Sequence, residues 1–463
     1  MKSLLLAVFY ILWAATAFGT SDIYPKVGTP PTVASFLPSP AHTYYCATTG
    51  SNTTGDGSIG NPWVDLIGAA ATVGPGDLIY FRGGTYPAYA YSNFSRSQNM
   101  LSVDGTLPAP IVITNYPGEI VKWDSVDTIW SLTLDGDYQK LIGTKVGAQY
   151  GIQITGGISI RANNVQVSGV DFIGGTSNGG DLNPAMLSVP LNDGCDNLVI
   201  SHCSFRDSAH QSTADRMACI RLFRNTNSII EYNVFKNNLE LDDCASVYYK
   251  DNTQDSIVRW NTFVDSVKGV QYFTQDFVGG GHDGLDVYGN LFYNVEYPFL
   301  FRNEFGANVR IHDNVALQIP ATGAFFYYLN AEPDGVGTDH GQYWNNVIEG
   351  TGFEQGWHAN SANAANLPDV FDYNLWKSAL DRNAPWGDQG YHAHAVTNAT
   401  LGITYNTTTL TATASDTYPG RSVGLVSSNI GGFSWNAAAT GGMVLGSGLT
   451  QVGAGNTRVA PIP

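Results

Sequence analysis

The sequence predicts an all-β protein built as a solenoid of stacked parallel strands, because one asparagine recurs along the middle of the chain in a constant setting. The residue two places after each asparagine is apolar, and the phrases are EYNVF (Asn233), RWNTF (Asn261), YGNLF (Asn290), HDNVA (Asn314), WNNVI (Asn346) and DYNLW (Asn374). The intervals between them are 28, 29, 24, 32 and 28 residues. A period in this range indicates coils that bury their apolar faces only against one another.

Each phrase alternates as a strand does, and Cys203 occupies the asparagine position 30 residues before Asn233. Equivalent residues of stacked strands lie about 4.8 Å apart, so the asparagines are expected to form an internal ladder of hydrogen-bonded amides. A buried amide without a partner would cost roughly 1–3 kcal/mol. The residues two places later predict a second, apolar column, which contains Phe205, Phe235, Phe263, Phe292 and, after aliphatic gaps, Trp376.

Composition and termini favour a secreted protein with one solenoid domain. The chain has 463 residues with 52 Gly, 25 Tyr and 21 Phe but only 22 Lys plus Arg, and a solenoid grows by adding coils rather than domains. Residues 1–19 read as a signal peptide, which predicts a secreted, extracellular or periplasmic location, and no other apolar run is long enough to span a membrane. Residues 20–42 form a Pro-rich leader, 43–380 the β-helix domain and 381–463 a closing region with a few edge strands.

The net charge of −17 disfavours nucleic acid and anionic membranes as partners, since both require a basic surface. The five cysteines include no CxxC pair, which argues against zinc. Cys219 and Cys244 lie one coil apart and could form a disulfide, Cys203 could instead pair with either, and buried thiols are the third alternative.

The stretch from Tyr44 to Tyr86 resembles the opening of right-handed parallel β-helix proteins of the pectate-lyase-like superfamily, which includes polysaccharide lyases and glycoside hydrolases. It reads YYCATTGSNTTGDGSIGNPWVDLIGAAATVGPGDLIYFRGGTY. The resemblance implies an N-terminal capping helix over 62–72, a turn at 75–77 and a first strand over 78–81. Such a helix would cover the open end of the core and its strand edges.

A second set of strands carries the candidate site, because outward residues of successive coils converge on a groove suited to a polysaccharide. The phrases are CIRLFRN, SVYYKDN, VQYFTQD, PFLFRNE and FFYYLNA. Arg221 or Arg224, Lys250, Thr274 and Arg302 fall near one edge. The tyrosines Tyr248, Tyr249 and Tyr272 lie close by and, with Arg221, are candidates for binding substrate. The register is open by one residue, and such a slip would turn alternate side chains to the other face.

Basic residues beside tyrosines on an acidic protein favour β-elimination of a uronic-acid-containing glycan. That reaction requires a neutralised carboxylate and a base to take the neighbouring proton. Lys250 is the predicted base, and Arg302 or Arg224 the carboxylate partner. Flanking positive charge should ease loss of the lysine proton, which predicts an alkaline pH optimum. Glu240, Asp242 and Asp243 form an acidic turn that could hold calcium. The competing interpretation is that these residues are solvated charges and ordinary turn residues.

Two groups within the superfamily offer patterns for comparison. Glu240, Asp242 and Lys250 are similar to the alginate lyase and chondroitinase B group, although Thr274 and Gln275 stand where that group has an arginine. Asp242-Asp243-Cys244, Gly281-His282 and Arg310-Ile311-His312 resemble, in chain order, the polygalacturonase-like set, in which two aspartates act as acid and base. His312 stands where that set has lysine.

Three functions therefore remain open: a secreted polysaccharide lyase, an inverting glycoside hydrolase, and a noncatalytic glycan-binding or surface β-helix. The sequence names neither the glycan nor the oligomeric state.

Overall fold

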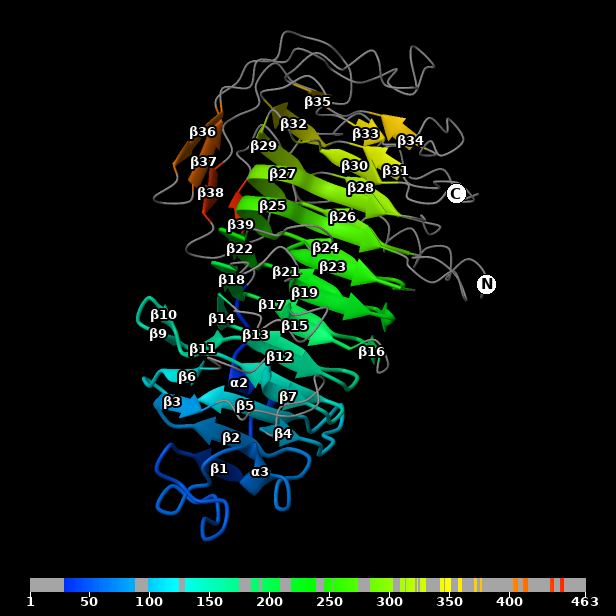
Figure 1. Ribbon diagram of the computed structural model, residues 1–463. Coiled ribbons are helices and arrows are strands. Elements are labelled where there is room, and N and C mark those ends of the chain that lie inside the picture. Colours follow the sequence, from blue (N-terminus) through cyan, green and yellow to red (C-terminus); the bar gives the residue numbers. More distant parts are fainter. Residues whose placement is uncertain are drawn as a thin grey trace, which may run out of the picture.

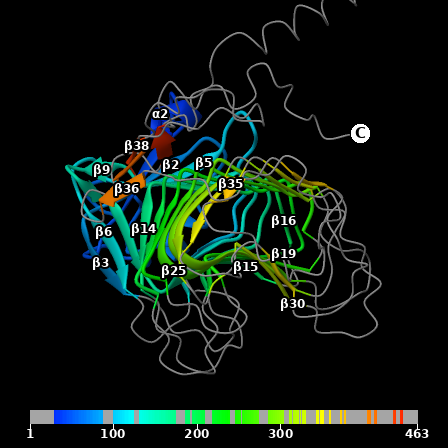
Figure 2. The ribbon, with the colours of Figure 1, turned by 90° about the horizontal axis from the view of Figure 1, so that it is seen from above.

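The computed structural model describes residues 29–87, 99–124, 130–174, 185–190, 194–208, 218–238, 245–251, 253–273, 284–302, 309–312, 314–320, 323, 325–329, 342–344 and 346–350, and seven further short strands between 357 and 444. These residues form a parallel β-helix in which the coils stack from β1 to β35 (Figure 1). Most coils contribute a strand to each of three columns (Figure 2). The buried side chains between the columns make one apolar core.

The first column is a 12-stranded parallel sheet. Its strands are β1 (Thr43–Cys46), β2 (Leu78–Phe81), β5 (Ile111–Asn115), β8 (Gln139–Ile142), β13 (Gln166–Ser168), β17 (Val199–Ser201), β21 (Ile229–Glu231), β24 (Ile257–Arg259), β26 (Asp286–Tyr288), β28 (Arg310–His312), β31 (Gln342–Trp344) and β34 (Val370–Asp372). The strand predicted at 78–81 is confirmed as β2, and β1 precedes it in the sheet.

The second and third columns share a 19-stranded sheet, because β25 (Thr262–Phe273) and β27 (Leu291–Arg302) run through the corner between them. The other strands of the second column are β3 (Gly84–Pro87), β6 (Val121–Asp124), β11 (Ile152–Thr155), β14 (Val170–Ile173), β18 (Ser204–Arg206), β22 (Val234–Lys236), β29 (Val315–Ile319), β32 (Val347–Gly350) and β35 (Leu375–Trp376). Those of the third are β4 (Met100–Leu101), β7 (Trp130–Leu134), β12 (Gly157–Ile160), β15 (Ala185–Val189), β19 (Ala218–Phe223), β23 (Val247–Lys250), β30 (Phe326–Leu329) and β33 (Trp357–Ala359).

Smaller sheets lie outside these columns. A hairpin joins β9 (Lys145–Val146) to β10 (Gln149–Tyr150), and β16 (Cys195–Asp196) pairs with β20 (Asn225–Thr226). In the predicted closing region, β36 (Ile403–Asn406), β37 (Thr411–Ala414), β38 (Ser434–Asn436) and β39 (Gly442–Val444) form an antiparallel sheet. The domain boundaries predicted from sequence stay predictions.

The asparagine ladder is confirmed at the corner between the first and second columns. The side-chain Oδ1 of Asn261, Asn290, Asn314 and Asn346 accepts hydrogen bonds of 2.9–3.1 Å from the backbone N–H and the Nδ2 of the asparagine one coil earlier. The backbone N–H of Cys203 donates to Asn233 Oδ1 at 2.9 Å. The ladder therefore satisfies amides that are almost completely buried. Asn374 lies outside the described residues.

The residue before a ladder asparagine takes up the bend of the chain. His202, Tyr232, Trp260 and Gly289 have φ between 55° and 65°. This left-handed conformation is unfavourable for residues with a Cβ, yet three of the four are aromatic. Their rings stack, with centroids of His202 and Tyr232, and of Tyr232 and Trp260, 4.9 Å apart. Ring contacts of this kind contribute about 0.5–1.5 kcal/mol each, which offsets the local strain.

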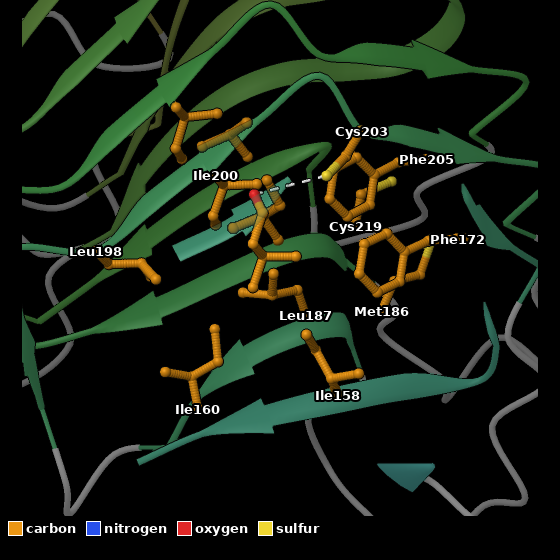
Figure 3. Packing of buried hydrophobic residues seen from close by; sticks show 14 of the residues in the cluster. Ile158, Ile160, Phe172, Met186, Leu187, Leu198, Ile200, Cys203, Phe205 and Cys219 are labelled. Carbon is orange, nitrogen blue, oxygen red and sulfur yellow. Dashed lines mark hydrogen bonds between the residues drawn. The ribbon is translucent and has the colours of Figure 1, made fainter. Parts of the chain in front are cut away.

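The predicted apolar column is also confirmed. Phe205, Phe235, Phe263 and Phe292 stack with centroid distances of 4.6–5.0 Å and interplanar angles of 6–10°. The backbone register continues it through Ala316 and Ile348 to Trp376. The stack also extends one coil earlier than predicted, because Phe172 lies 4.7 Å from Phe205 (Figure 3).

The N-terminal end of the core is covered differently from the prediction. Only α3 (Leu66–Ala69) is helical within the predicted 62–72, and Asp65 caps it by accepting from the backbone N–H of Ile67. Leu66, Ala69 and the ring of Trp63 are buried in the core. A single helical turn and an indole therefore close the end where a longer helix was expected.

The leader contains a second short helix, α2 (Val33–Phe36), which packs on the outside of the first column (Figure 2). Its Val33 and Phe36 contact a cluster formed by Leu37, Leu78, Val112 and Ile142. The predicted signal peptide lies outside the described residues. No helix in the described part of the chain is long and apolar enough to cross a membrane.

Three of the cysteines, Cys46, Cys195 and Cys203, are buried free thiols. Cys203 packs in the apolar core, where burial raises its pKa to about 12. Because it is a free thiol, its suggested role as a disulfide partner is wrong. The suggested Cys219–Cys244 pair lies partly outside the described residues, because only Cys219 is described.

Candidate functional site

The third column resolves the register that the sequence left open. Phe223, Lys250, Phe273 and Arg302 are aligned on neighbouring strands, and we call them the Lys250 row. Ser188, Arg221, Tyr248, Gln271 and Leu300 form the parallel Gln271 row. The residues between these rows are in the core. Because successive side chains of a strand point to opposite faces, the described side chains of both rows lie on the outer face.

Tyr249 and Tyr272, predicted to bind substrate, are instead part of the core. Their rings stack at 5.6 Å, and Tyr272 stacks on Phe301 at the same distance. The Tyr249 hydroxyl lies 3.4 Å from Ser228 Oγ, and burial raises the pKa of both tyrosines. Side chains that face the interior do not meet a glycan on the outer face, so this part of the prediction is corrected.

Tyr248 and Arg221 lie side by side in the Gln271 row. The guanidinium carbon of Arg221 is 5.5 Å from the centroid of the Tyr248 ring, a cation–π distance. Arg221 is completely buried and Tyr248 is 1% exposed. The Tyr248 ring also stacks on Phe273 of the next coil, with centroids 6.3 Å apart. These contacts fix the positions of a cation and an aromatic ring beside the Lys250 row.

Lys250 lies between two aromatic rings of its own row. Its Nζ is 5.3 Å from the centroid of Phe223 and 5.2 Å from that of Phe273, and the residue is 8% exposed. The sequence predicted an outward lysine that contributes little packing. Its direction is confirmed, but the low exposure shows that the side-chain stem is packed against its neighbours.

The two predicted carboxylate partners flank Lys250 at different distances along the axis. Arg224 follows the Lys250 row on the preceding coil, is exposed, and donates its backbone N–H to Lys250 O at 3.3 Å. Arg302 is aligned with Phe273, and thus lies two coils beyond Lys250. The side chain of Arg302 is outside the described part of the structure.

The predicted calcium residues Glu240, Asp242 and Asp243 lie outside the described residues, as do Thr274 and His282. Within the residues that the structure describes, no group of three or more His, Cys, Asp or Glu side chains could hold a metal ion. The calcium prediction is therefore untested.

Arg310 and His312, from the polygalacturonase-like pattern, lie on the outer face of the first column. Arg310 Nη2 is 2.8 Å from Asp286 Oδ2, and His312 Nε2 is 2.9 Å from Asp286 Oδ1. The His312 ring also stacks on Tyr288 at 5.2 Å. Arg310 and Asp286 thus form an ion pair, with His312 hydrogen-bonded to the same carboxylate, on a different strand column from Lys250.

A family described as Pel9A-like, right handed beta helix region, matches residues 44–251. Residues 44–251 are thus similar to the right-handed β-helix region of that family. The predicted fold and its handedness are confirmed.

Several solved structures are similar to the chain. Pectate lyase Pel9A is 14% identical, with 74% of this chain and 81% of that one covered and a TM-score of 0.41. An alginate lyase from Paenibacillus sp. str. FPU-7 is 14% identical, with 69% and 98% covered and a TM-score of 0.42. The GH136 lacto-N-biosidase from Eubacterium ramulus is 14% identical, with 69% and 68% covered and a TM-score of 0.38. No curated protein matches the sequence.

The Pel9A-like region ends at residue 251, directly after Lys250. It includes Arg221 and Tyr248, whereas Phe273 and Arg302 belong to coils beyond it. Sequence reasoning missed two buried polar residues of β25, Lys268 and Gln271. Neither is repeated in adjacent coils, so no periodic signal could have found them.

Proposed function

We propose that the protein is a secreted polysaccharide lyase that cleaves a uronic-acid-containing glycan by β-elimination, with Lys250 as the base. The observation that carries this proposal is the position of Lys250 on the outer face, held between Phe223 and Phe273 and next to the Arg221–Tyr248 pair. The Pel9A-like region contains Lys250, and Pel9A is a pectate lyase, an enzyme acting on a polymer of uronic acid.

In the proposed reaction, Lys250 Nζ takes the proton from the carbon next to the sugar carboxylate. The electron pair forms a double bond to the adjacent carbon, the bond from that carbon to the glycosidic oxygen breaks, and the leaving oxygen takes a proton from water. Arg224 and Arg302 are the proposed partners of the carboxylate, whose neutralisation acidifies the carbon. Tyr248 and Arg221 are proposed to bind the sugar.

Calcium and export remain part of the proposal. Glu240, Asp242 and Asp243 supply the hard oxygen ligands that calcium prefers, and a bound calcium ion would add positive charge near the carboxylate. The apolar run in residues 1–19 supports export.

The test is a glycan panel of pectate, alginate, glycosaminoglycans and neutral polymers, assayed with calcium and with chelator. A lyase gives an unsaturated product that absorbs in the ultraviolet. Lys250→Ala is expected to lower turnover by about 10²–10⁴-fold, and activity should be higher in mildly alkaline solution. Asp242→Asn with Asp243→Asn should abolish any sensitivity to chelator.

Because Lys250 is packed, Lys250→Met serves as a second variant that keeps the stem. Lys236→Ala is the matched control, since Lys236 lies on β22 in the second column. Near-normal turnover by both Lys250 variants would exclude Lys250 as the base. Reducing ends without ultraviolet absorbance would indicate a hydrolase, and binding without cleavage a noncatalytic protein.

A further inference from the structure

Gln271 lies in the third column on the outer face of β25. Its neighbours along the strand, Val270 and Tyr272, are in the core, and the backbone register aligns it with Tyr248 on one side and Leu300 on the other. The amide therefore points away from the core, in the same row as Arg221 and Tyr248.

This amide is buried but makes no hydrogen bond. Gln271 has no exposed surface, and neither its Nε2 nor its Oε1 has a hydrogen-bond partner. Buried polar groups in native proteins are nearly always paired, so an exception needs an explanation. In Gln139, by contrast, the buried Nε2 donates to the carbonyls of Leu101 and Val103 at 2.9 Å, and only the Oε1 is without a hydrogen-bond partner.

Aromatic and basic side chains surround Gln271. Tyr248 and Phe273 present two stacked rings beside it, and Lys250 lies in the adjacent row, 5.2 Å from Phe273. Lys250 and Phe273 retain 8% and 6% exposure, so solvent reaches the row next to Gln271. Apolar walls with a few convergent polar groups are typical of ligand sites.

We propose that Gln271 is a specificity-determining residue that hydrogen-bonds the ring hydroxyls of the uronic acid residue placed at Lys250. A glutamine amide offers one acceptor and two donors, which matches a pair of neighbouring hydroxyl groups. The substrate class is thus a polyuronate with free ring hydroxyls, and O-acetylation at these positions prevents binding. This inference rests on the proposed function, because it places the sugar at Lys250.

The test measures affinity and stability in the same variants. Binding of short oligogalacturonates and oligomannuronates, each with and without O-acetyl groups, is measured by calorimetry in a Lys250→Met background, so that no turnover occurs. Gln271→Met removes the amide at similar volume, and Gln271→Asn keeps the amide but shortens its reach. Both should raise Kd for the unmodified oligomer by about tenfold or more, and the preference over the acetylated oligomer should be lost.

Gln139→Met is the matched control. It breaks two hydrogen bonds and should lower Tm without changing Kd. Gln271→Met breaks none and should leave Tm unchanged or raise it by a few degrees. An equal fall of Tm in the two Met variants would overturn the inference, because it would mean that the Gln271 amide has a protein partner.

An unchanged Kd in both Gln271 variants would also overturn it, as would the absence of binding to every oligouronate by the parent. The proposed lyase activity can be refuted independently of the role of Gln271. If the wild type forms no unsaturated product but Gln271→Met weakens binding, the lyase assignment is wrong. Gln271 then hydrogen-bonds sugar hydroxyls in a noncatalytic site.

Discussion

Two sets of buried amides in this solenoid behave in opposite ways. In the ladder, the amides of Asn233, Asn261, Asn290 and Asn314 donate both to a ladder asparagine and to a backbone carbonyl. On the outer face of the third column, the amide of Gln271 has no hydrogen bond at all. The comparison teaches that a buried polar group stabilises the fold where a neighbouring coil supplies its hydrogen-bond partner.

The two sets of amides differ because only the ladder repeats one residue type along the axis. A ladder residue meets the same residue type one coil away, so each hydrogen bond is made again along the axis. The row of Gln271 contains serine, arginine, tyrosine and leucine. Because no residue type is repeated in this row, it cannot form a ladder of like side chains.

The largest effect on stability is expected from Asn261→Leu, which interrupts the ladder. The substitution leaves the buried backbone N–H of Asn233 without its acceptor and removes one hydrogen bond to the carbonyl of Ile230. At about 1–3 kcal/mol for the orphaned N–H and about 0.5–1.5 kcal/mol for the other lost bond, the free energy of unfolding should fall by roughly 2–4 kcal/mol, as measured by urea denaturation.

Asn294→Gly is the control for that measurement. Asn294 is exposed, has φ 51° and donates its Nδ2 to Asp265 at 2.8 Å. Glycine accepts this conformation, so stability should change little. Equal unfolding midpoints for Asn261→Leu and the wild type would mean that the ladder does not contribute to stability.

A smaller, pH-dependent effect is expected at Lys140, a second lysine on an outer face. Its Nζ donates to Asn164 O at 2.8 Å and lies 5.9 Å from the Phe36 ring of α2. Burial lowers the pKa of Lys140 from 10.5 to about 8. Between these values the unfolded chain binds more protons than the folded one, so stability should rise with pH across this window.

The rise is on the order of 2 kcal/mol after allowing for partial exposure. Urea midpoints measured from pH 7 to above pH 10 should show it in the wild type but not in Lys140→Met. The difference between the two curves isolates Lys140 from the tyrosines and cysteines. Parallel curves would contradict the assigned desolvation.

The smallest effect, and the only gain, is expected from Cys203→Asn, which would add one rung to the ladder. Cys203 holds the ladder position, and its Sγ lies 3.8 Å from Val167 O. An asparagine Nδ2 there can donate to Val167 O and to Asn233 Oδ1, as its neighbours do. The expected gain is about 0.5–1.5 kcal/mol, seen as a higher Tm. A loss of stability would mean that the packing of Cys203 outweighs the added hydrogen bonds.

The repeating parts of the fold could be predicted from the sequence. The intervals of 24–32 residues between the asparagines give the length of each coil. The phenylalanine two places later identifies the strand face that points into the core. The predicted phenylalanine column began one coil too late, at Phe205 instead of Phe172. Phe172 lies in VDFIGG, a phrase without an asparagine or cysteine in the ladder position.

The candidate site was harder to predict, because the third column has no repeated residue to fix its register. In SVYYK the two tyrosines are adjacent, so one of them must face the core, and the sequence does not say which. The structure assigns Tyr249 to the core and Tyr248 to the outer face. Whether Lys250 was packed or free also depended on Phe223 and Phe273, which are close to it only after the coils stack.

The ladder has a direction along the axis. In every bond between two ladder asparagines, the earlier residue donates and the later one accepts. On a ribosome, which makes the chain from its N-terminus, the newest coil always presents donors whose acceptors are still to be synthesised. The ladder hydrogen bonds can therefore close only in the order in which the coils are translated.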